Sequence, residues 1–272
     1  MANDAREGRP EQPQLTDPYS TGLLSKDYPS ELARLRAVEG WADPQSIALL
    51  QSLPIRPDFR CLEMGAGAGS IAYWLADRCS HGRVVAADID PRYLDARRFP
   101  NLEIAQTDLI TDDFPKGHFD LIHARLTLSH IPQRDDILSR AIGWLKPGGW
   151  IVVEDYYVPP VSEMSCEPMR VVMGAAMDAF AAQGTDMLWA RKIPERLIRL
   201  GVQDLRLLTQ PLTIGVGLPS EAVWRLSLEQ FFPSFLEKEL LTEAEIAAYR
   251  ALTPLDAIDL LWFGISVAGQ RR

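Results

Sequence analysis

The sequence is poor in the residues that mark secreted, metal-binding and nucleic-acid-binding proteins. Its 272 residues include only three cysteines, Cys61, Cys79 and Cys166, and four histidines. Their spacing matches neither a disulfide framework nor a zinc site, so we expect a cytoplasmic protein with no bound metal. Lys and Arg total 28 against 37 Asp and Glu, a net charge of −9. This balance disfavours nucleic acid as a partner, because phosphate binding depends on clustered cations.

Long hydrophobic runs are also absent. The uncharged stretch from Leu260 to Gly269 is far shorter than the ~20 residues of a membrane-spanning helix, so no membrane partner is expected. Residues 1–18 are polar and contain three prolines, which predicts a flexible leader and not a signal peptide. The remaining residues, 19–272, are sufficient for one large domain.

Strand and helix patterns alternate from about residue 58 to residue 156, which is typical of a parallel sheet with crossover helices. Apolar runs predict strands at 59–64, 83–88, 102–105, 119–124 and 150–154. Helical spacing or a cap followed by proline predicts helices at 31–39, from Asp43-Pro44, at 70–79, from Asp90-Pro91 and at 135–145.

After residue 156 this alternation stops. Two helical patterns, 169–183 and 190–200, follow each other without a strand, and strand patterns return at 202–208 and 260–268. We therefore expect an α/β fold with a seven-stranded, mostly parallel, doubly wound sheet and N-terminal helices. Its core would comprise residues 58–156, 190–210 and 258–270, with helical cap insertions at about 157–189 and 218–255.

A glycine turn, Gly65-Ala-Gly67-Ala-Gly69, follows the first strand of this core, and Glu63 stands at the strand's tip. Glycines there allow a ligand to approach the backbone, although the turn could also be only structurally tight. Ser70 occupies the position where the dinucleotide fingerprint has its third glycine, which weakens the alternative of a nicotinamide oxidoreductase.

Asp88 ends the next predicted strand, 23 residues beyond Gly65. This is close to the offset at which an acid binds the hydroxyls of a ribose. The alternative is that Asp88 caps a helix, but Asp90, directly before Pro91, suits that role better.

Five motifs in this order resemble those of the class I, Rossmann-like, S-adenosylmethionine-dependent methyltransferases. They are Glu63 to Gly69, Val84 to Asp88, Asp108, Phe119 to Arg125 and Leu145 to Gly149. In detail they are similar to small actinobacterial methyltransferases that act on metabolites, and the resemblance covers about residues 60–156. It implies S-adenosylmethionine as the cofactor.

The resemblance also implies which residues bind that cofactor: Glu63, Gly65, Ala66, Gly67, Asp88, Ile89, Asp108, Leu109, Ala124 and Arg125. The turn would meet the methionine end, Asp88 the ribose and Ile89 the adenine. Asp108 matches the family acid at the adenine amino group, but it could also be an ordinary turn residue. Arg125 could bind a carboxylate of cofactor or substrate, or pair with Asp120 or Glu154.

Methyl transfer is an in-line displacement, so it mainly requires that the acceptor be held about 3–3.5 Å from the methyl carbon. His130 and His123 are the candidate catalytic bases for a hydroxyl acceptor, although His123 could be a hydrogen-bonded core residue and His130 could fix a loop. The apolar inserted segments favour a small lipophilic acceptor. The predicted function is therefore methylation, on oxygen, of a lipophilic secondary metabolite. The alternative is that the protein binds S-adenosylmethionine but catalyses cyclisation or rearrangement without methyl transfer. A homodimer is also compatible with the sequence.

Overall fold

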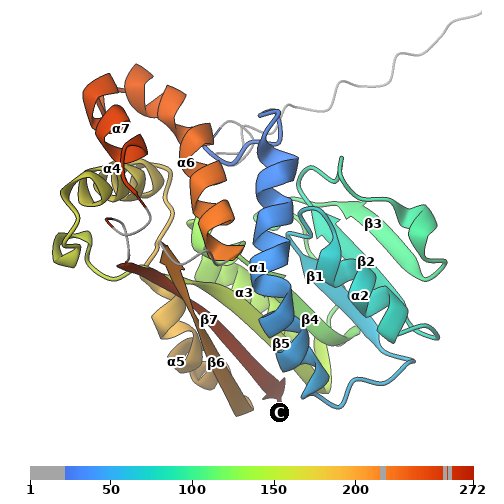
Figure 1. The fold of residues 1–272 in the computed structure, drawn as a ribbon. Coiled ribbons are helices and arrows are strands. Elements are labelled where there is room, and N and C mark those ends of the chain that lie inside the picture. The colour runs from blue at the N-terminus through green and yellow to red at the C-terminus, as the bar shows by residue number, and fades with distance from the viewer. Residues whose placement is uncertain (1–21, 215–218, 254–255, 257–258) are drawn as a thin grey trace, which may run out of the picture.

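The computed structural model describes residues 22–214, 219–253, 256 and 259–272, so the predicted leader at 1–18 lies outside the described residues. Its centre is a seven-stranded sheet with the order β3-β2-β1-β4-β5-β7-β6 (Figure 1). Strand β7 is antiparallel to both of its neighbours, whereas the pairs from β3 to β5 are parallel. The strands are β1 (Arg60–Met64), β2 (Arg83–Asp88), β3 (Leu102–Gln106), β4 (Phe119–Arg125), β5 (Leu145–Tyr157), β6 (Val202–Ile214) and β7 (Asp259–Arg271). The predicted seven-stranded, mostly parallel α/β fold is confirmed.

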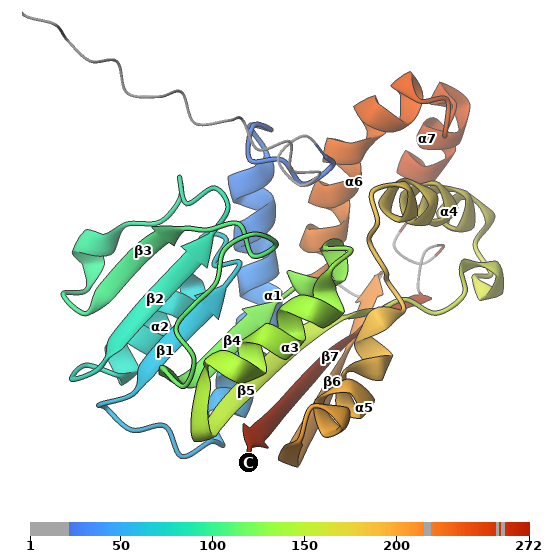
Figure 2. The same ribbon diagram turned by 180° about the vertical axis from the view of Figure 1, so that it is seen from behind.

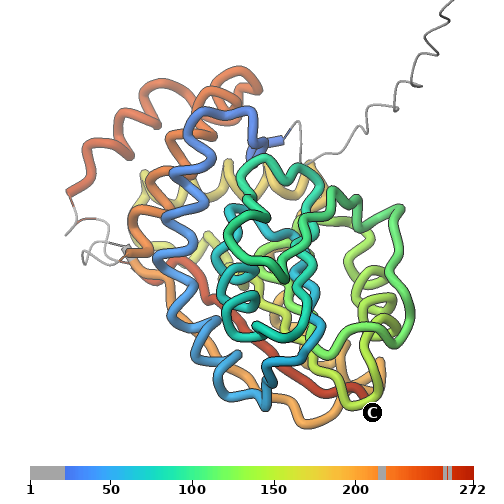
Figure 3. Tube along the Cα trace, turned by 90° about the vertical axis from the view of Figure 1, so that its right-hand side faces the viewer, coloured from blue at the N-terminus to red at the C-terminus, as the bar shows by residue number. Residues whose placement is uncertain are grey.

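Helices cover both faces of this sheet. Helices α1 and α2 lie on one face, and α3 and α5 lie on the other (Figures 1 and 2). The side view in Figure 3 shows the same layers, with α1 and α3 on opposite sides of the strands. The helices are α1 (Glu31–Gln51), α2 (Ser70–Arg78), α3 (Arg134–Trp144), α4 (Glu167–Ala182), α5 (Ile193–Arg199), α6 (Pro219–Glu237) and α7 (Glu243–Arg250).

Helices α4, α6 and α7 form a cap over the carboxyl ends of the central strands (Figure 1). Its buried aromatic residues share one hydrophobic cluster with Val38 and Trp41 of α1. A polar link reinforces this packing, because the Gln230 side chain on α6 donates to the Leu23 carbonyl (2.9 Å) and to Glu31 (2.8 Å). The cap and the N-terminal segment are thus held together above the sheet.

Two helix predictions were wrong. The helices expected at 31–39 and from Asp43-Pro44 form one continuous helix, α1, with Pro44 inside it. Asp43 does not cap a new helix, because its carboxylate pairs with Arg125 (2.8 Å) and accepts from Ser70 (2.9 Å). Buried residues on both sides of Pro44 keep the helix in one piece against the core.

The α-helix expected from Asp90-Pro91 is instead a turn followed by a short 3₁₀ helix, Ala96–Arg98. Arg92 is drawn into ion pairs with Asp27 (2.8 Å) and Asp90 (2.7 Å), so this segment fastens the N-terminal residues. Strand β5 also begins five residues earlier than predicted, at Leu145, which pairs with Phe119.

Candidate functional site

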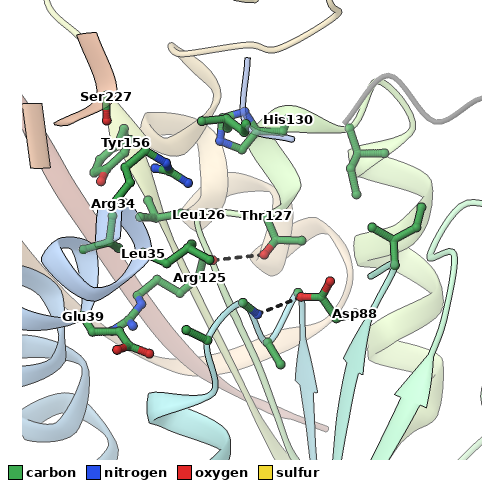
Figure 4. Close-up of a pocket in the computed structure, with 18 of the residues that line it drawn as sticks. Arg34, Leu35, Glu39, Asp88, Arg125, Leu126, Thr127, His130, Tyr156 and Ser227 are labelled. Atoms are coloured by element: carbon green, nitrogen blue, oxygen red, sulfur yellow. Dashed lines mark hydrogen bonds between the residues drawn. The ribbon is translucent and has the colours of Figure 1, made fainter. Parts of the chain in front are cut away.

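A pocket lies at the carboxyl ends of β1, β2 and β4, between α1 and the cap (Figure 4). Ten of the predicted site residues line it: Glu63, Gly65, Ala66, Gly67, Asp88, Ile89, Asp108, Leu109, Arg125 and His130. The other two, Ala124 and His123, are buried beneath it, with exposed fractions of 1% and 0%. The fold therefore brings most of the predicted set to one place.

The three glycines of the turn have different tasks. All have positive φ (69°, 58° and 97°), a region that favours glycine. A Cβ atom at Gly65 would lie 2.2 Å from the Thr127 hydroxyl, and one at Gly69 would lie 2.5 Å from the Tyr73 ring. A Cβ at Gly67 would meet only Leu35, at 3.7 Å. Gly65 and Gly69 thus permit close internal packing, whereas Gly67 leaves space on the pocket side.

Asp88 is at the tip of β2, as predicted, but its carboxylate already has partners. One oxygen accepts from the Gly67 N–H (2.7 Å), which ties β2 to the glycine turn. The other accepts from the Asp90 N–H (2.9 Å) and pairs with the Lys26 ammonium (2.8 Å). Lys26 also donates to the Asp90 carbonyl, so the N-terminal segment crosses the predicted ribose site.

His123 is part of a buried polar chain below the turn. Its Nδ1 lies 2.7 Å from Glu63, and its Nε2 lies 2.7 Å from Glu154, which in turn accepts from Ser266 (2.5 Å). Burial alone would lower the pKa of His123, but the two carboxylates raise it to about 9. The imidazole is therefore protonated at neutral pH, and both of its nitrogens are hydrogen-bonded. It positions Glu63 and is a poor base, because no nitrogen is available to accept a proton.

Glu63 and Glu154 differ although both contact the same histidine. Burial raises the pKa of Glu63 above its usual range despite the attraction of His123. Burial acts in the same direction on Glu154, but the hydrogen bonds from His123 and Ser266 and the charges of His123 and Arg125 hold its pKa below the usual range. Of these three buried polar side chains, Glu63 is the one that lines the pocket, so it is the one that could contact a ligand.

His130 follows β4 at the end of a 3₁₀ turn, Leu128–His130, and lines the pocket. Its Nδ1 lies 3.3 Å from the Thr185 hydroxyl, and its ring is 5.8 Å from that of Phe180. Burial, together with the cations Arg34 and Arg134, lowers the pKa of His130 to about 3. It is therefore a neutral hydrogen-bonding group at pH 7 and a weak base.

Arg125 is paired with neither Asp120 nor Glu154. Its guanidinium forms an ion pair with Asp43 (2.8 Å) and donates to the Ser46 hydroxyl (2.9 Å), both on α1. Beside it, the Ser70 N–H donates to Glu39, also on α1 (3.2 Å). The Arg125 bonds fasten α1 to the end of β4, and the Ser70 bonds fasten α1 to the start of α2, so Ser70, the departure from the dinucleotide pattern, has a structural role.

Asp108 lines the pocket, but it also builds its own turn. Its Oδ1 accepts from the Ile110 N–H (2.8 Å), and its N–H donates to Asp112 (2.9 Å). The expected turn role is therefore present together with a position at the pocket's edge.

The far side of the pocket is built from aromatic residues of the cap, where the apolar inserted segments predicted the acceptor site, and from residues of β5, β7 and α1. Tyr156 on β5 and Trp262 on β7 stack with ring centroids 5.0 Å apart, and Trp224 on α6 meets Trp262 edge-on at 5.0 Å. Arg34 on α1 lies beside Tyr156 and is paired with Glu31 (2.7 Å) (Figure 4). Arg34 and Trp262 are the residues of this wall that no sequence pattern indicated.

Comparison with known proteins gives the same assignment for the central part of the chain. A family model described as a methyltransferase domain matches residues 62–151. Residues 62–151 therefore form a methyltransferase domain, which makes up about a third of the chain. The matched range begins in β1 and ends within β5, so it includes the glycine turn, Asp88 and the end of β4.

Individual relatives match only part of the chain. Methyltransferase str3 of Strobilurus tenacellus is 37% identical over 98 residues, which are 35% of this chain and 35% of that protein. The match thus spans about a third of that curated relative.

Solved structures are similar in fold over most of the chain. A phosphoethanolamine N-methyltransferase 2 of Haemonchus contortus has a TM-score of 0.59 and 18% identity, covering 91% of this chain and 58% of that one. The geranyl diphosphate C-methyltransferase of Streptomyces coelicolor has a TM-score of 0.56 and 14% identity, covering 93% and 89%. At these identities the likeness concerns the fold.

Proposed function

We propose that this protein transfers a methyl group from S-adenosylmethionine to a small, largely apolar metabolite, and that the acceptor atom is an oxygen. The observation that supports this most strongly is the continuity of the pocket. It runs from Gly67 and Asp88 to the aromatic wall at Tyr156 and Trp262, so a donor and an acceptor would share one space.

The pocket suits the cofactor on its sheet side. The open side of Gly67 leaves the room that a ligand beside the turn requires, and Glu63 and Asp88 supply carboxylates for an ammonium group and for ribose hydroxyls. Ile89 and Leu109 offer apolar contact near Asp108 for an adenine. When bound, S-adenosylmethionine supplies an electrophilic methyl group.

The protein's own part is then mainly to position the acceptor and to exclude water. Leu126, at the end of β4, has a left-handed backbone (φ 53°), and its N–H donates to the Glu154 carbonyl (2.8 Å). The side chain of Leu126 lines the pocket floor between the turn and the aromatic wall. Such strain in a non-glycine residue is commonly retained where a site requires it.

The weak basicity of His130 points to an acceptor that does not depend on a strong protein base. Burial, together with Arg34 and Arg134, lowers the pKa of His130, so its neutral imidazole would share a hydrogen bond with the acceptor and not take its proton. We therefore assign His130 the role of a neutral hydrogen-bond partner and His123 a positioning role through Glu63.

The test begins with calorimetric titration of the protein with S-adenosylmethionine and S-adenosylhomocysteine, followed by incubation with S-adenosylmethionine and a panel of lipophilic phenols and hydroxyquinones. Mass spectrometry should show products heavier by one methylene and an equal amount of S-adenosylhomocysteine. Products of unchanged mass would favour cyclisation or rearrangement. Absence of binding by either cofactor form would refute the proposal.

A further inference from the structure

Three buried hydrogen-bond donors on the wall of the pocket have no partner in the part of the chain that the structure describes. One is the indole N–H of Trp224, and the other two are the Tyr156 hydroxyl and the indole N–H of Trp262, whose rings stack on each other. The side chains of Tyr156 and Trp262 are 7% and 5% exposed, and both residues line the pocket. Buried polar groups without partners cost free energy, so a cluster of them calls for an explanation.

The arrangement of the two rings is closely determined by their surroundings. Tyr156 lies between Trp41 (5.6 Å) and Trp262 (5.0 Å). Gly264 pairs with Tyr156 across β5 and β7, and a Cβ at Gly264 would lie 3.1 Å from the Trp41 ring. The absence of a side chain at 264 thus gives Trp41 room to support Tyr156 from α1.

All three unpartnered groups are donors. An indole N–H only donates, and burial raises the pKa of the Tyr156 hydroxyl, so this group keeps its proton. The complementary ligand atom is therefore an acceptor, such as a carbonyl or ether oxygen. The aromatic rings around it, from Trp224, Phe180 and Phe231 of the cap, favour a planar apolar frame next to that oxygen.

The arginine side chains near this wall are paired with carboxylates. Arg34 is paired with Glu31 through two hydrogen bonds (2.8 and 2.7 Å), and Arg125 is paired with Asp43. An anionic ligand would lose its hydration on entering the pocket, and these two arginines could not compensate the loss, because their charges are already balanced by carboxylates. A neutral ligand does not carry this cost.

We propose that the cap side of the pocket binds a neutral aromatic ketone or quinone whose carbonyl oxygen accepts a hydrogen bond from the Tyr156 hydroxyl, with the Trp262 N–H as the second donor. This rests on the proposed function, in which such a molecule, with a hydroxyl beside its carbonyl, would be the methyl acceptor: the new O–CH3 bond replaces the O–H bond, and the proton is released. Tyr156 is then a specificity-determining residue that selects acceptors with a carbonyl beside the reacting group.

The test uses three matched probes: 1-acetylnaphthalene, its hydrocarbon analogue 1-isopropylnaphthalene and the anion 1-naphthoate. Each is titrated calorimetrically into the protein with and without saturating S-adenosylhomocysteine. We expect 1-acetylnaphthalene to bind about tenfold more tightly than the hydrocarbon, and naphthoate to bind less tightly than the ketone. Tyr156→Phe should weaken ketone binding about fivefold to tenfold and leave hydrocarbon binding unchanged, because it removes only the hydroxyl.

Tyr157→Phe is the matched control. Tyr157 is the next residue on β5, stacks on Phe263 and does not line the pocket, so all three affinities should remain as in the wild type. Thermal unfolding should show Tyr156→Phe at least as stable as the wild type, since the lost hydroxyl has no partner within the described residues. Equal binding of ketone and hydrocarbon, an unchanged preference in Tyr156→Phe, tighter binding of naphthoate or no probe binding at all would overturn the inference. Failure of the proposed function can be distinguished from failure of this inference, because the wild-type protein would then not bind S-adenosylhomocysteine.

Discussion

The Lys26 ammonium lies 2.8 Å from the Asp88 carboxylate, and both side chains are almost fully buried. Lys26 is held there by its neighbours, because its carbonyl accepts from Arg92 (3.1 Å) and Tyr93 (3.2 Å). Asp88 is the residue proposed to bind the cofactor ribose. If Asp88 binds the ribose as proposed, the N-terminal segment competes with the cofactor for the same carboxylate.

Lys26→Met should strengthen binding of S-adenosylmethionine about tenfold. The substitution removes the ion pair that must be broken before Asp88 accepts ribose hydroxyls, and tenfold corresponds to about 1.4 kcal/mol. Calorimetric titration measures the effect, and Lys116→Met, at an exposed position, is the control. Weaker binding in Lys26→Met would show instead that Lys26 remains in the bound site as a ligand of the cofactor.

Asp88→Asn should weaken binding of S-adenosylmethionine by about 1–3 kcal/mol, because charge-assisted hydrogen bonds to the ribose are lost. The Asn side chain retains an acceptor for the Gly67 N–H, so the turn should keep its shape. Asp77→Asn, at an exposed position of α2, should leave the affinity unchanged. Wild-type affinity in Asp88→Asn would remove Asp88 from the site.

The pH dependence of stability should report the charge of His123. Its pKa is about 9 in the folded protein against about 6.5 for an ordinary histidine, so between these pH values folding is coupled to the uptake of a proton. The stabilisation is complete below pH ~6.5 and is lost as the pH rises through about 9, by about 3 kcal/mol at most. Urea unfolding between these pH values should show this decline in the wild type and in His81→Gln but not in His123→Gln. A flat wild-type profile would contradict the charged imidazole.

His130 should behave in the opposite way. Its pKa is lowered to about 3, so the ring should stay neutral while the protein remains folded, and stability should fall as the pH drops from about 6.5 through 3. Nitrogen NMR of labelled histidine, with the signal assigned through His130→Asn, should show a neutral imidazole at pH ~5. Titration of that signal near pH ~6.5 would contradict the half-buried, cation-flanked environment and restore His130 as a candidate base.

Gly65→Ala should destabilise the protein by about 3 kcal/mol or more. The new methyl would meet Thr127 at 2.2 Å and would also impose strain at φ 69°. Gly117→Ala separates the two effects, because Gly117 has a similar φ of 61° and open space around it, so only about 1 kcal/mol is expected. Similar losses in both variants, measured by chemical denaturation, would mean that the Gly65–Thr127 contact is not tight.

The predicted location of the donor side of the site illustrates what local sequence is able to specify. Strand, glycine turn and helix follow one another within residues 60–78, and Asp88 ends the adjacent parallel strand, so their meeting at one sheet edge follows from the order of elements. The same reasoning failed at Asp90-Pro91. There, ion pairs of Arg92 with Asp27 and Asp90 hold a turn where a cap and a proline favour a helix.

The sequence by itself determined the α/β class, the seven strands and most of the proposed cofactor residues, because these depend on periodicity and on contacts close along the chain. Individual roles of site residues and the location in the cell stay predictions. The tertiary structure decided that Lys26 meets Asp88 across 62 residues and that His123 is enclosed by Glu63 and Glu154 across 60 and 31 residues. It also decided that Tyr156 and Trp262 form the far wall. Such pairings arise from the packing of distant segments, which no local pattern encodes, and they set the charge and the free hydrogen-bonding capacity of the site.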